Sequence, residues 1–119
     1  MVDDGAPRVE YRLLGPVEVW ADGHRIDAGQ PRQRAVLAAL LVDSGRVVPV
    51  ETIIDRVWGQ AAPDRVRATL RTHLSRIRRL LEQAAPSVSA PAALSHESGG
   101  YLLQVDSDQV DLHLFRRLA

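Results

Sequence analysis

The chain has 119 residues, of which 45% are hydrophobic and 25% charged, a composition typical of one small globular domain. It contains no Cys, which excludes disulfide scaffolds, thiolate zinc sites and thiol catalysis, and its longest apolar run, residues 35–42, is far short of the roughly 20 residues that cross a bilayer. The first residues are acidic rather than basic and apolar, so we expect a cytoplasmic protein without a secretory signal.

The formal net charge is zero, but the charges are unevenly distributed along the chain. Residues 31–83 hold ten Arg and five acidic residues, whereas residues 1–30 and 84–119 are both net acidic. All 15 basic residues are Arg, a bias that the base composition of a genome can produce. The position of the Arg residues is therefore more informative than their identity, and it directs attention to the middle of the chain.

The N-terminal third has the pattern of a small β-sheet. Residues 1–10 are mostly small or acidic, and we expect a flexible leader there. Apolar and polar residues then alternate over 11–14 and 17–20, as in half-buried strands. The Asp22-Gly23 dipeptide favours a tight turn, and residues 25–27 are suited to a return strand. The sequence predicts an antiparallel sheet.

Three helices are predicted after the sheet. Pro31 is suited to the first turn of a helix, and apolar residues recur at helical spacing from there until Gly45. A second, short helix ends near Gly59, where a left-handed cap is expected. The longest helical pattern runs from Asp64, a suitable N-cap, to about Gln83.

The remaining residues predict a loop, a hairpin and the start of another helix. Residues 84–93 are rich in Ala, Pro and Ser, whereas residues 94–97 and 101–105 read as strands on either side of a glycine-containing tip. Residues 107–119 resemble the first turns of a helix that continues beyond this sequence. Residues 11–106 therefore have the layout of an α+β winged helix-turn-helix, with an N-terminal antiparallel sheet, three helices and a C-terminal hairpin wing.

The third predicted helix has an apolar stripe and an arginine-rich opposite face. On a helical wheel, Val66, Leu74, Ile77 and Leu81 lie within about 40° of Leu70. Six Arg and no carboxylate occur between residues 65 and 81, although acidic residues would ordinarily be interleaved to form i,i+4 pairs. An α-helix fits the DNA major groove, where flanking Arg can bind phosphates and central Arg or short side chains can reach bases. The side opposite the stripe consists of Arg65, Ala68, Thr72, Ser75, Arg76 and Arg79, with Arg67, Arg71 and Arg78 on one flank and Thr69 and His73 on the other.

The predicted hairpin supports this interpretation. A glycine tip at Gly99 and Gly100 can lie close to a minor groove, and the neighbouring Tyr101 can place its hydroxyl on a phosphate. An ordinary hairpin turn with a packed Tyr explains the same residues equally well. A solvated helix face whose Arg content reflects composition alone is the corresponding alternative for the third helix.

Four stretches resemble the OmpR/PhoB-type winged-helix regulators, and most closely the Streptomyces antibiotic regulatory protein (SARP) family of AfsR-like activators. These are LGPVEV (14–19), PRQRAVLAALL (31–41), VWG (57–59) and ATLRTHLSRIRRLL (68–81), and the resemblance covers residues 11–105. It implies a transcription activator of biosynthetic gene clusters that binds direct repeats upstream of promoters, with a second protomer on the DNA, and helps recruit RNA polymerase holoenzyme. It also implies that residues 107–119 begin a helical bacterial transcriptional activation domain, so that this sequence is a DNA-binding domain taken from a longer protein.

The resemblance also implies residue roles. Thr72 and Arg76 match base-facing positions, with Ala68 and Thr69 in the leading turn of the helix. The position after the Gly-Tyr pair is Leu102 here, whereas many members have Arg there, so we expect the hairpin to offer backbone contacts only. His73, Ser75 and Arg78 match positions on the phosphate side; with the face and the hairpin tip described above, the predicted phosphate and backbone set is Arg65, Arg67, Arg71, His73, Ser75, Arg78, Arg79, Gly99, Gly100 and Tyr101.

Two other classes of function were weighed. For an enzyme, no His pair has i,i+4 metal spacing, and His96 and Glu97 are adjacent on a strand, so their side chains point to opposite faces. We therefore expect no catalytic residues, no metal, no cofactor, no small-molecule substrate and no membrane partner. A winged helix that binds RNA polymerase or itself without reading DNA is the stronger alternative, but it would be expected to expose apolar residues on the third helix.

Overall fold

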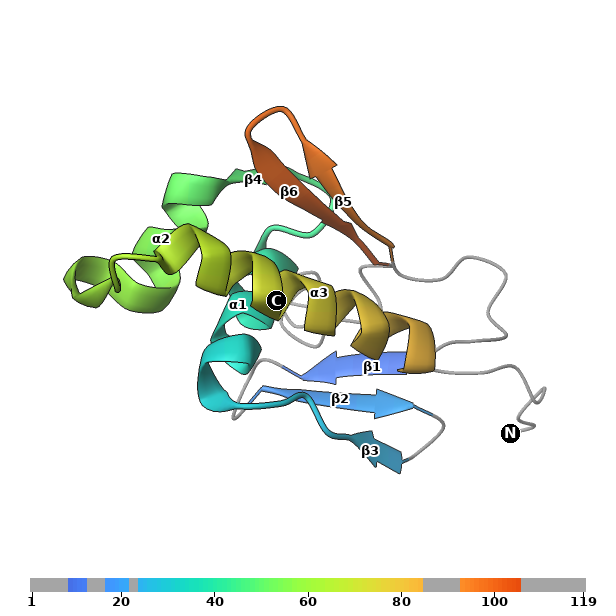
Figure 1. Cartoon of the computed structure of the whole chain (residues 1–119). Coiled ribbons are helices and arrows are strands. Elements are labelled where there is room, and N and C mark those ends of the chain that lie inside the picture. The colour runs from blue at the N-terminus through green and yellow to red at the C-terminus, as the bar shows by residue number, and fades with distance from the viewer. Residues whose placement is uncertain (1–8, 13–16, 22–23, 85–92, 106–119) are drawn as a thin grey trace, which may run out of the picture.

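The computed structural model describes residues 9–12, 17–21, 24–84 and 93–105, and in this part of the chain two small antiparallel sheets flank three helices (Figure 1). The predicted turn at residues 22–23 and the predicted helix start at residues 107–119 lie outside the described residues. No helix in the described ranges is long and apolar enough to span a membrane. The expected winged-helix layout is confirmed.

The N-terminal sheet consists of β1 (Val9–Arg12), β2 (Glu18–Ala21) and β3 (His24–Ile26) in that order. Its first strand begins at Val9, two residues before the expected domain boundary. Tyr11 and Val19 lie opposite each other and are fully buried against the helices, because alternate residues of a strand face the same side. Burial raises the pKa of the Tyr11 hydroxyl to about 12.

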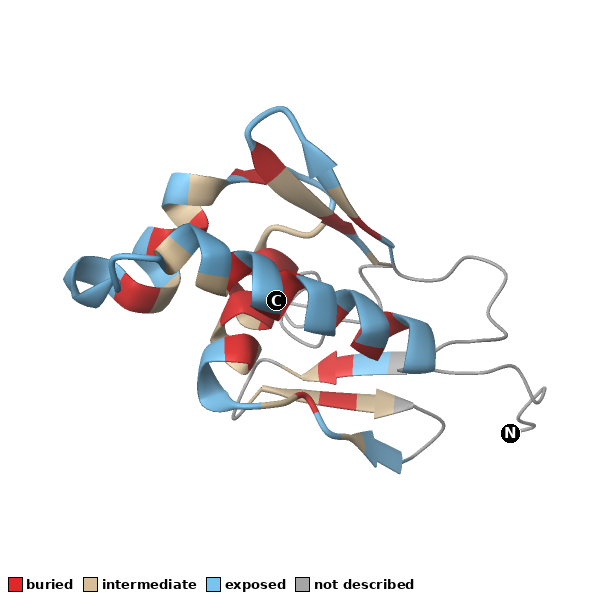
Figure 2. Cartoon of the chain, viewed as in Figure 1, coloured by how far each residue is buried: buried red, intermediate tan, exposed pale blue. Residues whose placement is uncertain are grey.

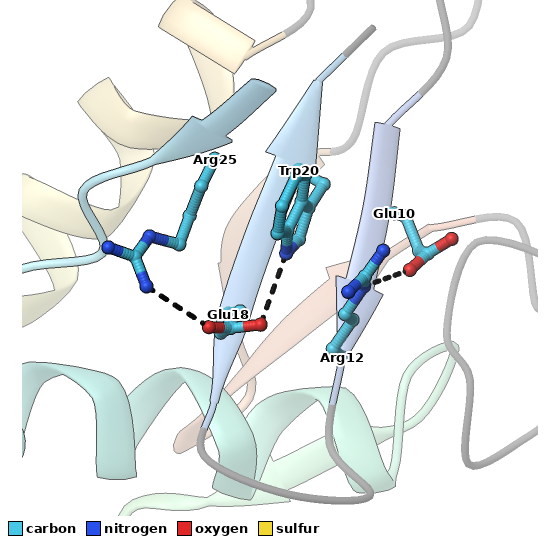
Figure 3. Close-up of polar contacts among 5 residues, drawn as sticks. All are labelled: Glu10, Arg12, Glu18, Trp20 and Arg25. Atoms are coloured by element: carbon cyan, nitrogen blue, oxygen red, sulfur yellow. Dashed lines mark hydrogen bonds and ion pairs between the residues drawn. The ribbon is translucent and has the colours of Figure 1, made fainter. Parts of the chain in front are cut away.

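The other face of this sheet carries charged side chains around one indole (Figure 3). The Arg12 guanidinium lies 4.2 Å from the centre of the Trp20 ring and also pairs with Glu10. The carboxylate of Glu18 accepts hydrogen bonds from Trp20 Nε1 at 3.2 Å and from Arg25 at 3.3 Å. Each charge on this face therefore has a partner of opposite sign within the sheet itself.

Helix α1 (Pro31–Val42) begins with proline at its first helical position, as the sequence predicts. The buried residues of α1 include Val36, Leu37 and Leu40, so this helix lies at the centre of the domain, packed on both other helices. After α1 the chain turns at Gly45, whose φ of +84° lies in the left-handed region that favours glycine.

A short strand that the sequence analysis did not predict, β4 (Val47–Pro49), lies between the first two helices and pairs with the C-terminal hairpin. Helix α2 (Val50–Trp58) follows it directly and is continued by a 3-10 turn, η1 (Gly59–Ala61). Gly59 adopts the expected positive φ, +58°, and its N–H donates to the Asp55 carbonyl, which ends α2.

Helix α3 (Val66–Ala84) begins two residues after the Asp64 that the sequence suggested as N-cap. Leu70, Leu74, Ile77 and Leu81 are buried, which confirms the predicted apolar stripe, and Val66 is half-buried at its end. The stripe is wider than the prediction, because Leu80 and His73 are buried as well. Fully burying one such leucine stabilises the fold by about 1.5–3 kcal/mol, so this stripe fixes which face of α3 is turned outward.

The C-terminal hairpin consists of β5 (Ala93–Glu97) and β6 (Gly100–Gln104), which confirms the predicted wing. Strand β6 lies between β5 and β4, so the hairpin is attached to the chain segment that leads into α2. Gly100 packs against the backbone of Val48 so closely that a Cβ at this position would overlap the Val48 carbonyl. The hairpin is therefore anchored to β4, and it lies alongside α3 rather than projecting independently (Figure 1).

Candidate nucleic-acid interface

The outward face of α3 carries most of the side chains that the sequence predicts to meet DNA. Because Leu70, Leu74 and Ile77 are turned into the core, the opposite side of the helix is left open to solvent (Figure 2). The exposed residues of the predicted set are Arg65, Arg67, Ala68, Arg71, Thr72, Ser75, Arg76, Arg78 and Arg79, and Thr69 is half-buried. The structure thus brings nearly all predicted helix residues to one exposed surface, which we call the α3 face.

Four guanidinium groups on the α3 face have no protein partner in the described part of the chain. Neither an ion pair nor a side-chain hydrogen bond involves Arg65, Arg71, Arg76 or Arg79 within those ranges. Like charges spaced along one helix repel each other, and here no carboxylate of the described chain forms an ion pair at these four positions. Such a surface is suited to an anionic partner that supplies several negative charges in a row.

Arg67 differs from these four because its guanidinium forms an ion pair with Glu51 in the first turn of α2. Both side chains are more than half exposed, so the pair contributes only about 0–1 kcal/mol to stability. Glu51 is thus a weak competitor that an approaching phosphate can displace from Arg67. The sequence contained both charges but gave no signal that α2 would bring them together.

Arg78 contacts the hairpin as well as solvent. Its Nε and Nη2 atoms donate to the Leu94 carbonyl of β5 at 3.3 and 3.2 Å. A charged donor makes a stronger hydrogen bond than a neutral one, so this contact connects the middle of α3 to the first strand of the hairpin. Arg78 therefore has a structural contact that its predicted phosphate role did not anticipate.

Thr72, a predicted base-facing residue, uses its hydroxyl proton within its own helix. Thr72 Oγ1 donates to the Ala68 carbonyl at 3.2 Å, the bond that a threonine commonly makes to residue i−4 in a helix. Toward a ligand the side chain then offers its methyl group and the acceptor lone pairs of its oxygen. A methyl group at this point of the face suits an apolar contact with a thymine methyl.

His73 is the helix residue whose position differs most from its predicted role. It is 9% exposed, and its ring centre lies 6.3 Å from that of Trp58 in α2. Its Nδ1 atom is buried with no hydrogen-bond partner among the described residues. Burial, followed by the charges of Arg76 and Arg32, lowers the pKa of His73, which favours the neutral form of the imidazole. His73 therefore packs between α2 and α3, and its burial leaves little of the ring within reach of a phosphate.

The three predicted hairpin residues lie in different surroundings. Gly99 is exposed at the tip with a φ of +80°, and its carbonyl accepts a hydrogen bond from the Val50 N–H at 3.2 Å. Gly100 is buried against β4, so of the two glycines only Gly99 is presented at the surface. Tyr101 is half-buried, and its ring stacks on that of His96, with 4.8 Å between ring centres.

Arg32, at the start of α1, is a cation close to this surface that the sequence analysis did not single out. It is exposed, it lies 5.7 Å from the centre of the Trp58 ring, and it donates to the Val57 carbonyl at 2.7 Å. Nearby, a hollow of about 400 Å³ opens between the segment before α1 and the second half of α3, with Arg76 and Arg79 in its lining. Helices α1 and α3 are brought together only by tertiary packing, so no local sequence pattern could have identified Arg32.

The described residues contain no group of three or more His, Asp, Glu or Cys side chains that could hold a metal ion. What the fold presents instead is a cationic helix on a helical core, with a hairpin packed beside it. An N-terminal sheet, three helices and a C-terminal hairpin in this order define a winged helix-turn-helix domain of the OmpR/PhoB type.

Comparison with known proteins identifies the family. The chain belongs to the family described as "Transcriptional regulatory protein, C terminal", whose model matches residues 24–103. It is 37% identical to the regulatory protein AfsR of Streptomyces griseus over 114 residues, which cover 96% of this chain and 11% of AfsR. It is 38% identical to the transcriptional regulator RedD of Streptomyces coelicolor over 112 residues, which cover 92% of this chain and 31% of RedD. The predicted resemblance to AfsR-like regulators is confirmed.

Solved structures support the same assignment. The chain is similar to the structure titled Mycobacterium tuberculosis EmbR in complex with low affinity phosphopeptide, with a TM-score of 0.81 and 34% identity over 92% of this chain and 28% of that one. The DNA-binding domain of E. coli CadC is similar in fold, with a TM-score of 0.63 and 21% identity. The chain spans about a tenth to a third of the length of the curated relatives named here.

Proposed function

We propose that this domain binds duplex DNA in a sequence-specific manner, with α3 in the major groove and the hairpin near the adjacent minor groove. The observation that carries the proposal is a group of four exposed guanidiniums, three on α3 and one on Arg65 directly before it, without a protein partner in the described ranges. B-DNA carries one phosphate charge per roughly 1.7 Å of its axis. This row of negative charges can pair with the unpaired guanidiniums of the α3 face. The width of the major groove also accepts a single α-helix.

The side chains of the α3 face divide into two roles under this proposal. Ala68, Thr69, Thr72 and Arg76 face the bases, because the first three are small enough to let the helix approach and Arg can donate two hydrogen bonds to guanine. His73 and Gly100, both buried, support the helix packing and the hairpin in place of contacting phosphate. The phosphate and backbone contacts are assigned to Arg65, Arg67, Arg71, Ser75, Arg78, Arg79, Gly99 and Tyr101.

We further propose that the domain serves a longer activator. AfsR and RedD are named as regulators, and this chain matches only a small part of each of them. In that setting the domain binds direct repeats upstream of promoters, two protomers occupy one operator, and the bound protein helps recruit RNA polymerase. The role is one of binding without a catalytic step, and it is carried out on the chromosome in the cytoplasm.

A protein-binding winged helix remains the competing class, and the surface argues against it. Such a module is expected to expose apolar anchors on α3, because protein interfaces are built around buried aromatic and aliphatic side chains. Among the described residues, the one large hydrophobic side chain classed as exposed is Val47, which lies on β4 and not on α3. The α3 face offers Arg, Thr, Ser and Ala instead.

The test is a fluorescence anisotropy titration of the 119-residue chain with two duplexes across a salt series. One duplex is selected by the protein from a random-sequence pool, and the other is a scrambled control of equal length. We expect affinity to fall steeply as salt rises, because binding to phosphates releases counterions. A flat salt response, or a selection that enriches no sequence, contradicts the proposal.

One substitution then separates base reading from general attraction. We expect Arg76→Ala to weaken binding to the selected duplex by about 1–3 kcal/mol and to the scrambled duplex much less. Equal losses on both duplexes would assign Arg76 to a phosphate.

A further inference from the structure

A second hollow of about 400 Å³ is lined by residues of α2, α3 and the hairpin. In Figure 1 the hairpin lies on the side of α3 away from the N-terminal sheet. We call this hollow the helix–hairpin hollow. Its lining combines three kinds of side chain from four elements, α2, α3, β5 and β6: Val50 and Leu70, Arg67 and Arg71, and His96 and Tyr101. None of these groups was singled out as a cluster by the sequence, because they are brought together only when the hairpin packs beside α3.

The aromatic side of the hollow is a plate of two stacked rings. His96 and Tyr101 are directly opposite each other in the β5–β6 register, and their ring planes differ by 22° with 4.8 Å between centres. Cross-strand stacking restricts both side chains, so the plate keeps one orientation. The plate presents apolar ring surface with polar edges.

The helical side of the hollow supplies charge. Arg71 is exposed and has no ion pair in the described chain, whereas Arg67 is already paired with Glu51. Leu70, which lies between these two arginines in the sequence, is 1% exposed and forms the floor of the hollow, whereas the half-buried Val50 offers accessible aliphatic surface. The hollow therefore places one available cation beside aromatic and aliphatic surface, a combination that suits a ligand with an anionic group joined to an apolar ring.

Duplex DNA has such a unit at a predictable place. The major and minor grooves are separated by a sugar–phosphate backbone, so a protein with a helix in one groove and a hairpin at the next must straddle one strand. A deoxyribose presents carbon-bound hydrogens, and its phosphate carries the charge. The straddled strand would pass between α3 and the hairpin, where the hollow lies.

We propose that the helix–hairpin hollow binds one sugar–phosphate unit of the strand between the two grooves, with Arg71 on the phosphate and the His96–Tyr101 plate against the deoxyribose. This inference rests on the proposed DNA binding and adds a residue, His96, to the interface. The contact is independent of base identity and fixes the register of the helix on the duplex. The residue after Tyr101 is Leu102, which is consistent with a hairpin that contacts the DNA backbone rather than reading the minor groove through an arginine.

The experiment is a methylphosphonate scan of the duplex selected in the test above. Each phosphate in turn is replaced by an uncharged methylphosphonate, and the dissociation constant is measured for the wild-type chain, Arg71→Ala and the control Arg79→Ala, which lies nearer the other end of α3. We expect one methylphosphonate position at which the wild-type chain binds about tenfold more weakly than it binds the unmodified duplex. At that position Arg71→Ala should show no further loss of affinity, whereas Arg79→Ala should still show the tenfold loss. Identical profiles for wild type and Arg71→Ala overturn the proposed phosphate contact.

The aromatic plate is tested separately with His96→Ala and His96→Phe. We expect His96→Ala to weaken binding several-fold on selected and scrambled duplexes alike without changing the salt slope, and His96→Phe to retain wild-type affinity because the ring surface is preserved. Thermal melting of each variant without DNA checks that the hairpin still folds. If His96→Ala binds DNA with wild-type affinity, or if both variants lose affinity equally, the proposed contact between the plate and the deoxyribose is wrong. Failure of DNA binding itself is distinguishable, because it is seen with the wild-type chain before any variant is compared.

Discussion

Replacing Arg78 with alanine tests whether this side chain of α3 both stabilises the packing of the hairpin and contacts DNA. The guanidinium donates from two nitrogens to the Leu94 carbonyl of β5. A hydrogen bond from a charged donor contributes about 1.5–3 kcal/mol, and partial exposure of Arg78 lowers the expected cost of Arg78→Ala to about 1–2 kcal/mol. For a domain of this size, such a loss lowers the melting temperature by at least about 4 °C.

The matched control is Arg79→Ala, which removes the same charge at the next position, where the described structure shows no hydrogen bond from the guanidinium. Thermal melting followed by circular dichroism should give a lower melting temperature for Arg78→Ala than for Arg79→Ala. In the DNA titration, the slope of log affinity against log salt concentration should be smaller by about one for each variant than for the wild type, as expected for the loss of one phosphate contact. Equal melting temperatures for the two variants would refute the role of Arg78 in holding the hairpin, and an unchanged slope would refute its phosphate contact.

Three further predictions concern single residues. Gly100→Ala should destabilise the domain by about 1–3 kcal/mol in a denaturant titration, because its Cβ would overlap the Val48 carbonyl; unchanged stability would show that β4 can move aside. His73 has a lowered pKa in the folded domain, so the unfolded chain binds more protons below about pH 6.5 and stability falls as the pH drops through that value. His73→Phe should reduce this loss between pH 7.5 and 5.5, and an identical pH profile would contradict the assignment. Glu51→Gln should strengthen DNA binding a few-fold at low salt by freeing Arg67 and removing a negative charge, and the gain should vanish at high salt.

Elements whose signals are local could be predicted without the structure. Pro31 and Gly59 mark a helix start and a helix end because their backbone preferences act on the chain immediately around them. The division of α3 into a buried stripe and an arginine face follows from a period of 3.6 residues, which requires no knowledge of what the helix packs against. The hairpin was likewise predictable from two short strands around a glycine tip.

Tertiary structure decided the contacts that depend on distant partners. Strand β4 is only three residues long, and it exists because β6 offers it a partner from the far end of the chain. The helical wheel placed His73 on a flank of the helix, yet the ring packs beside Trp58 of α2 and is buried, which widens the buried stripe. Two arginines that the helical wheel placed on the flank form contacts, Arg67 with Glu51 and Arg78 with the Leu94 carbonyl, because α2 and β5 lie within reach of that flank. Side-chain periodicity is a property of one helix, whereas the pairing of a charge is a property of the packed molecule.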